Sequence, residues 1–228
     1  MVPGIYKLID GSLVQKLRFD TISNNLANIN TNAFKKDIIS FHQILTMKNN
    51  STTDFTPGPM RYTGNQLDVA LDGPGFFKVQ SPRGMRYTRD GSFTLNGNQQ
   101  LVTQSGDIVL GQNGPMTIGG GNVSIAPDGA VVVGGAQVDR LALFDFRKPQ
   151  LLIKEGNSCY RYGGGKKDIF SAEKVSVQNG YLESSNVNPT EEMIKMVEAL
   201  RVFESAQKAI QCMDESTSKI VNDAALLQ

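Results

Sequence analysis

The sequence is poor in the residues that most often carry enzyme chemistry. It has no tryptophan, one histidine and two cysteines among 228 residues. His42 alone cannot build a multi-histidine metal site, and any Ser-His-Asp or Cys-His arrangement would have to use it. Cys159 and Cys212 lie in different segments, so they indicate neither a disulfide framework nor a multi-cysteine zinc site. We therefore expect no enzyme activity, no catalytic residues, no metal and no cofactor.

An excess of charge of one sign and long apolar runs are also missing. Twenty-three Lys and Arg residues offset 22 Asp and Glu residues, so no excess of positive charge favours nucleic acid or anionic lipid as a partner. The longest apolar runs, such as residues 130–133, are far shorter than the roughly 20 residues that cross a bilayer. We expect no nucleic-acid partner, no direct membrane insertion and no small-molecule substrate. The first residues lack the pattern of a cleaved signal peptide, so any export is expected without one.

Glycine and proline are scarce at both ends of the chain. Twenty-one of the 23 glycines lie between Gly58 and Gly180. Because glycine and proline interrupt helices, this distribution predicts helical ends around a centre of another structure. The expected domains are residues 1-35 as the N-terminal helix of a helical core domain, 36-62 as an extended linker, 63-180 as a central β domain, and 181-228 as the C-terminal segment and helix of the core domain.

Apolar residues recur three or four positions apart at both ends, from about Ile5 to Asn28 and from Met193 to Ile220. This spacing predicts amphipathic helices. In the centre, apolar residues alternate instead, as in Leu67, Val69 and Leu71, and Asp-Gly or Asn-Gly pairs separate the alternating segments. The expected fold class is α+β, with long N- and C-terminal helices paired in an α-helical, coiled-coil-like domain and a central antiparallel all-β domain.

A striped helix must bury its apolar side, and the charges of the two ends are complementary. Residues 1–36 hold five Lys/Arg and two Asp/Glu, whereas residues 189–228 hold four and seven. Opposite net charges favour pairing of the two ends. Two interpretations remain open: the helices dock on their own β domain, or they pack against copies of the chain in an assembly.

Four blocks of the sequence resemble one family. Residues 23–36 read SNNLANINTNAFKK, and they are followed by LDVALDGPGFF at 67–77, YTRDGSFTL at 87–95 and GYLESSNVN at 180–188. Together they resemble the bacterial flagellar basal-body rod and hook proteins, in the order of that family and over nearly the whole chain. The compact centre favours the rod, and residues 201–204, RVFE, are more similar to the proximal than to the distal rod branch. Ala33 departs from the family, which usually has glycine there, and alanine tolerates a positive φ poorly.

The resemblance implies a structural subunit of the rod that self-assembles helically around the axial export channel and transmits torque from motor to hook. The implied partners are copies of itself, other flagellar rod proteins and the flagellar type III export apparatus, and the implied location is the basal body, in the periplasmic space. The alternative is a homo-oligomeric ligand-binding module with a β domain. Subunit interfaces are expected at the helical stripes and the Asn-rich turn: Ile5, Leu8, Phe19, Ile22, Asn24, Asn25, Leu26, Asn28, Phe34, Met193, Met196, Leu200, Phe203, Ile210 and Met213.

Overall fold

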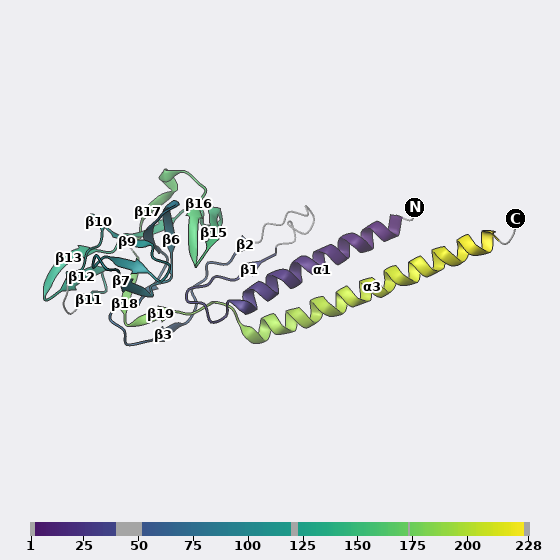
Figure 1. Ribbon diagram of the computed structural model, residues 1–228, viewed down its shortest axis with the longest axis horizontal. Helices are drawn as coiled ribbons and strands as arrows, with labels where there is room; N and C mark the ends of the chain where they lie inside the picture. The colour runs from purple at the N-terminus through teal and green to yellow at the C-terminus, as the bar shows by residue number, and fades with distance from the viewer. Residues whose placement is uncertain (1–2, 40–51, 120–122, 173, 226–228) are drawn as a thin grey trace. The chain divides into compact units, whose positions relative to one another are not determined.

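The computed structural model describes residues 3–39, 52–119, 123–172 and 174–225 (Figure 1). The chain divides into two compact units. Unit 1 comprises Met1–Ala27, Asp37–Thr52 and Asn188–Gln228, and unit 2 comprises Asn28–Lys36 and Thr53–Val187. These units divide the chain differently from the domain bounds expected above, which stay a prediction. His42 lies outside the described residues.

Unit 1 contains the helices α1 (Pro3–Ala27) and α3 (Pro189–Ala225), together with strand β1 (Asp37–Ile38). Strand β2 (Thr52–Thr53) straddles the boundary between the units. The start of α3 is fixed by its sequence, because Asn188 Oδ1 accepts hydrogen bonds from the backbone N–H groups of Thr190 at 3.1 Å and Glu191 at 3.3 Å. An asparagine N-cap followed by proline in the first turn is a favourable helix start.

The structure corrects the expected fold class. α1 and α3 contact each other within unit 1, but they are the only two α-helices in the described part of the chain, which is mostly β-sheet. The expectation of long terminal helices paired as a coiled-coil-like domain is wrong. The physical reason is that the apolar residues do not form one sustained seam: Ser12 and Gln15 interrupt the stripe of α1, and Met193 and Leu200 of α3 are exposed. A coiled coil requires every seam position to face its partner.

Unit 2 consists of short strands joined by tight turns, and every strand pairing described in it is antiparallel. Two short 3₁₀-helices, η1 (Pro149–Leu151) and η2 (Lys166–Asp168), interrupt them. The strands are β3 (Met60–Tyr62), β4 (Val69–Asp72), β5 (Phe76–Ser81), β6 (Gly84–Thr88), β7 (Phe93–Leu95), β8 (Leu101–Thr103), β9 (Ile108–Gly111), β10 (Gly114–Pro115), β11 (Val123–Ile125), β12 (Ala130–Val133), β13 (Ala136–Arg140), β14 (Leu143–Phe146), β15 (Leu152–Gly156), β16 (Cys159–Tyr162), β17 (Ile169–Ser171), β18 (Ser176–Asn179) and β19 (Tyr181–Glu183).

The largest sheet of unit 2 has ten strands, with the order β15-β16-β6-β5-β9-β8-β7. β10 extends it beside β9, β14 pairs with β5, and β17 pairs with β14. A three-stranded sheet, β11-β12-β13, and two ribbons, β18-β4 and β19-β3, complete the unit. The ribbons pair strands that are far apart in the sequence, so residues 176–183 return to the segment from β3 to β4.

The alternating apolar residues of the centre form the core of unit 2. Phe77 and Phe93 are almost fully buried and pack edge to face, with their ring centroids 5.0 Å apart. Gly91 allows a close approach nearby, because a Cβ at this position would lie 1.7 Å from the carbonyl oxygen of Val69. A second cluster is mainly aromatic and consists of Phe76, Tyr87, Phe146, Leu152 and Tyr160. Unit 2 therefore has an apolar core of its own, and other large apolar side chains, such as Tyr62 and Phe170, lie exposed on its surface.

Candidate functional site

Residues 28–36, which follow α1 and which we call the strap, belong to unit 2. Ala33 donates its backbone N–H to Glu183 O at 2.8 Å, and Asn186 donates its own to Phe34 O at 3.2 Å. Ala33, Phe34 and Lys35 are all buried. Ala33 keeps a positive φ of 53°, so the turn has the conformation that glycine adopts more easily. The strap is thus an integral part of the β unit.

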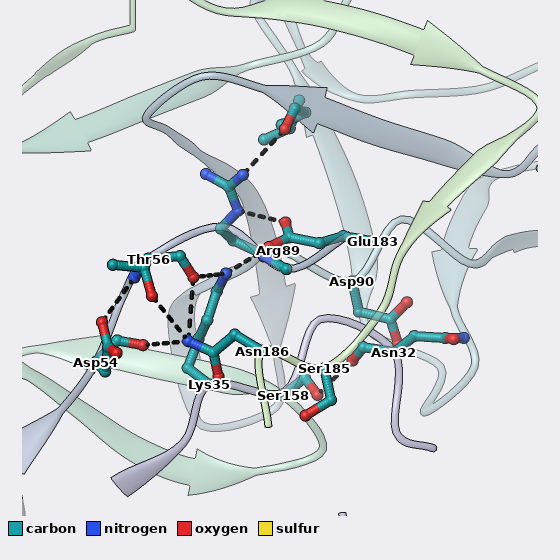
Figure 2. A network of polar contacts seen from close by, with 12 residues as sticks. Asn32, Lys35, Asp54, Thr56, Arg89, Asp90, Ser158, Glu183, Ser185 and Asn186 are labelled. Carbon is teal, nitrogen blue, oxygen red and sulfur yellow. Dashed lines mark hydrogen bonds and ion pairs between the residues drawn. The ribbon is translucent and has the colours of Figure 1, made fainter. Parts of the chain in front are cut away.

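A buried cluster of three charged side chains fixes the strap (Figure 2). Lys35 Nζ pairs with Glu183 Oε1, and Arg89 Nε donates to Glu183 Oε2 at 2.8 Å. All three side chains are at most 3% exposed. One carboxylate therefore neutralises two buried cations only in part, and buried charges require further hydrogen bonds to offset their desolvation.

Backbone carbonyl groups supply those further hydrogen bonds. Arg89 donates to the carbonyl oxygens of Leu71, Gly73 and Gly75 at 2.9 to 3.0 Å. Lys35 Nζ donates to Thr56 O at 2.8 Å. Burial lowers the pKa of Lys35 below its ordinary value, although attraction to Glu183 opposes that change. The cluster thus connects the strap to the loop between β4 and β5 in the core.

Asn186 completes the network with its side-chain amide (Figure 2). Its Oδ1 accepts the backbone N–H of Lys36 at 2.7 Å. Its Nδ2 donates to Asp54 O at 2.9 Å and to Thr56 O at 3.1 Å. Burial alone would raise the pKa of Asp54, but hydrogen bonds from Thr56 and the nearby Lys36 and Lys35 ammonium groups hold it below its usual value. One amide therefore joins its own segment to the segments around Lys36 and around residues 54–56.

In unit 1, Asn25 performs a comparable task. It is 1% exposed, and its Nδ2 donates to Asp37 O at 3.0 Å and to Glu192 Oε2 at 3.1 Å. Its Oδ1 accepts the backbone N–H of Asp37 at 2.9 Å. Asn25 thus joins the end of α1, the start of α3 and β1 within one subunit, and a carboxylate could not replace the two donated bonds.

The predicted interface residues fall into different environments. Ile22, Asn25 and Phe34 are buried, whereas Asn24, Met193 and Leu200 are exposed. Half-buried positions are Phe19, Leu26, Asn28, Met196, Phe203, Ile210 and Met213. Ile5 and Leu8 lie in α1, and their side chains are outside the part of the chain that the structure describes. The structure places Asn28 and Phe34 in unit 2 and the helical residues in unit 1. Their roles between subunits stay a prediction.

Sequence reasoning missed Lys35, Arg89, Glu183 and Asn186. Charged residues are almost always exposed unless they are paired, and the partners here are 94 to 148 residues apart. The one signal is that Lys35 follows Phe34 within the strap, and that Arg89 and Glu183 lie in two of the family-like blocks.

A pocket of about 320 Å³ that is lined by polar residues lies in unit 2, and Asp90 provides its one carboxylate. Burial raises the pKa of Asp90. The other lining residues are Thr31, Thr88, Thr103, Gln104, Ser105, Asn157 and Ser158. Across the described residues, no group of three or more His, Cys, Asp or Glu side chains is arranged to hold a metal ion, and no described helix is long and apolar enough to cross a membrane.

Comparison with known proteins gives two family matches and several relatives of full length. Residues 70–133 match the family described as "Flagellar hook protein FlgE/F/G D1 domain", and residues 178–223 match "Flagellar basal body rod FlgEFG protein C-terminal". The chain is 33% identical to the flagellar basal-body rod protein FlgF of Caulobacter vibrioides, over 97% of this chain and 96% of the relative. It is 32% identical to the flagellar basal-body rod protein FlgG of Buchnera aphidicola subsp. Schizaphis graminum, over 96% of this chain and 99% of the relative.

These matches define the class as the structural proteins of the bacterial flagellum. The chain belongs to the flagellar basal-body rod protein family, in the FlgF or FlgG branch. It is a structural subunit of the rod in the basal body, and the expectation from the four sequence blocks is confirmed.

Proposed function

We propose that the chain assembles with copies of itself and with other rod proteins in a helical stack around the axial channel, and that it transmits torque from motor to hook. Membership of the rod family supports this function. The proposal extends to export by the flagellar type III apparatus without a cleaved signal peptide, to a location in the periplasmic space, and to the absence of enzyme activity. The sequence RVFE at residues 201–204 supports the FlgF branch rather than FlgG.

The observation that carries the proposal is the exposed apolar surface of α3. Met193 is 57% exposed, Val197 49% and Leu200 41%. Their spacing of four and three residues places them on one side of the helix. Glu192 and Ala199, on another side, are buried. A row of exposed large apolar side chains marks an interaction surface, and a rod protein offers neighbouring subunits as the partners that cover it.

The test is a deletion of the gene in its own bacterium, followed by complementation. We expect the deletion strain to lose motility and its basal bodies to lack a complete rod. The wild-type gene should restore both, and an antibody against the chain should label purified basal bodies at the rod. Complete rods without this chain would refute the proposal. A ligand-dependent, non-flagellar phenotype would instead support the homo-oligomeric binding module.

A further inference from the structure

The covalent chain passes between the two units four times. The passages are Ala27 to Asn28, Lys36 to Asp37, Thr52 to Thr53, and Val187 to Asn188. Every force that the backbone carries from one unit to the other runs through these four connections. The residues of unit 2 that bind these connections therefore determine how firmly each connection is attached to unit 2.

Three of these passages lie next to residues that the side chain of Asn186 binds or to Asn186 itself. Asn186 lies one residue before Val187, its Oδ1 accepts from the N–H of Lys36, and its Nδ2 donates to the carbonyl groups of Asp54 and Thr56. The backbone N–H of Asp54 also donates to Lys36 O at 2.9 Å. The asparagine amide thus uses its acceptor and its donor group together, which neither a carboxylate nor an apolar side chain can do.

The buried ion cluster connects these segments to the core of the β unit. Lys35 is adjacent to Lys36. Lys35 Nζ donates a hydrogen bond to Thr56 O and forms an ion pair with Glu183. Glu183 Oε1 also accepts the N–H of Gly58 at 2.8 Å. Arg89 then connects Glu183 to the backbone of the β4–β5 segment. The connection from the passages to the sheet therefore consists of buried, charge-assisted hydrogen bonds.

A buried ion network of this kind is better suited to fixing the relative positions of the bonded segments than to raising the free energy of unfolding. Replacing a buried ion cluster by apolar residues of similar volume is often neutral or stabilising. Hydrogen bonds are directional, however, and a buried network is fully satisfied in only one arrangement. A cluster of this kind is suited to holding crossing segments in a fixed register.

We infer that Asn186 and the Lys35–Glu183–Arg89 cluster form a joint that clamps three of the four chain passages in one fixed bundle on the β unit. The joint prevents the segments around Lys36, Asp54 and Asn186 from sliding past one another when force is applied. Its mechanical role rests on the proposed function as a rod subunit, whereas the clamp itself is a property of the single chain.

The clamp is tested by hydrogen exchange on the purified full chain with the variant Asn186→Asp. A carboxylate would face the carbonyl oxygens of Asp54 and Thr56, so we expect exchange in the peptide covering residues 53–58 to rise at least tenfold. Exchange in β5 and β9 should not change. Asn98→Asp, an exposed asparagine in the turn after β7, is the control and should leave both regions unchanged. Unchanged exchange at 53–58, or equal loss of protection in β5, would overturn the joint.

Lys35→Met gives a second and independent measurement. It replaces the ammonium side chain by an unbranched apolar side chain that is one atom shorter, and it leaves Glu183 paired with Arg89. We expect the thermal midpoint of the β unit to stay the same or rise, while exchange at residues 53–58 increases. A residue that only stabilises the fold would lower the midpoint. Lys166→Met, at an exposed lysine of η2, should change neither readout.

The mechanical role is tested in cells that carry Asn186→Asp in place of the wild-type gene. We expect swimming speed to fall more steeply with medium viscosity than in cells with Asn98→Asp. Complete rods and normal motility in the deletion strain would refute the proposed function and not the clamp. Wild-type swimming at every viscosity, despite increased exchange at 53–58, would overturn the mechanical role.

Discussion

The two units differ in how many apolar side chains they bury: among the described residues, Ile22 and Ala199 are the buried apolar residues of unit 1, and the others lie in unit 2. In unit 2, Phe77, Phe93 and Val79 are at most 2% exposed, whereas Met193, Ile194 and Val197 of α3 in unit 1 are about half exposed. At roughly 1.5 to 3 kcal/mol for each large apolar side chain that becomes fully buried, unit 1 leaves much of its stabilisation unrealised in the single chain. We therefore expect the β unit to fold alone and the helical unit to gain stability from a partner.

The charged residues show the same contrast. Glu183 in unit 2 is buried and bonded to Lys35, Arg89 and Gly58. Glu191 in unit 1 is exposed and pairs with Lys195 at 2.7 Å across one helical turn. An exposed pair of this kind contributes only about 0.3 to 0.5 kcal/mol. The buried Glu183 fixes the structure of unit 2, whereas the exposed pair of Glu191 and Lys195 adds little to the stability of α3.

The largest expected effect is in the core of unit 2. Phe77→Ala should lower the free energy of unfolding of the β unit by about 3 to 5 kcal/mol, because it removes a buried ring that packs against Phe93. Urea denaturation followed by circular dichroism measures the change. Phe170→Ala, at a ring that is 43% exposed, is the control and should cost under about 1.5 kcal/mol. Equal losses in both variants would remove the contrast between core and surface.

A smaller effect depends on pH. Burial raises the pKa of the Cys159 thiol from 9.0 to about 11. The folded form therefore keeps its proton while the unfolded form loses it, so the stability from Cys159 is present below pH 9 and is lost as the pH rises to 11. The loss is about 2 to 3 kcal/mol for a change of two pH units. Urea denaturation between pH 8 and 11 should show a flatter profile for Cys159→Ala than for the wild type.

The exposed Cys212 of α3 provides the control for that experiment. Cys212→Ser should keep the wild-type pH profile. A thiol reagent at pH 8 should modify Cys212 rapidly and Cys159 only after unfolding, because the thiolate is the reactive form. Rapid labelling of Cys159 in the folded chain would show that the reagent reaches the core of unit 2 without unfolding.

Ala33→Gly should change the unfolding free energy by about 1 kcal/mol or less. The left-handed conformation costs a non-glycine residue roughly 1 to 2 kcal/mol. Glycine removes that cost, but it loses a buried methyl group and adds flexibility to the unfolded chain, each worth about 0.5 to 1 kcal/mol. Ala33→Val is the comparison and should destabilise the chain clearly, because a β-branched residue tolerates this conformation poorly. Thermal unfolding of both variants measures the difference.

The smallest effect on the isolated chain, and the sharpest test of the comparison, is Leu200→Asp. The side chain is 41% exposed, so the unfolding free energy should change by about 0.5 kcal/mol or less. Motility should nevertheless be lost, because an unpaired carboxylate in a packed subunit interface is costly. Ser205→Asp, on another side of α3, should preserve swimming. Normal motility with Leu200→Asp would show that this surface of α3 stays uncovered in the rod.

The sequence allowed the strands of the centre to be predicted and not the network that holds the strap. Val69 and Leu71, Phe77 and Val79, and Phe93 and Leu95 lie in β4, β5 and β7, because alternation and Asp-Gly turns are local signals. The helical stripes showed which residues are apolar, but not which ones face a neighbour, and the coiled-coil expectation was wrong for that reason. Apart from their places in the family-like blocks, Lys35 and Glu183 carry no local signal, since only the completed fold makes burial of their charges tolerable.

The contact between Lys35 and Glu183 also has a consequence for the order of folding. It joins residues 148 positions apart in the sequence, and closing so long a loop is entropically costly and slow. During synthesis from the N-terminus, the strap must wait for β19 and Asn186 before it can dock. Most of the chain is therefore made before the β unit can close, and we expect the newly made protein to stay open until β19 has emerged.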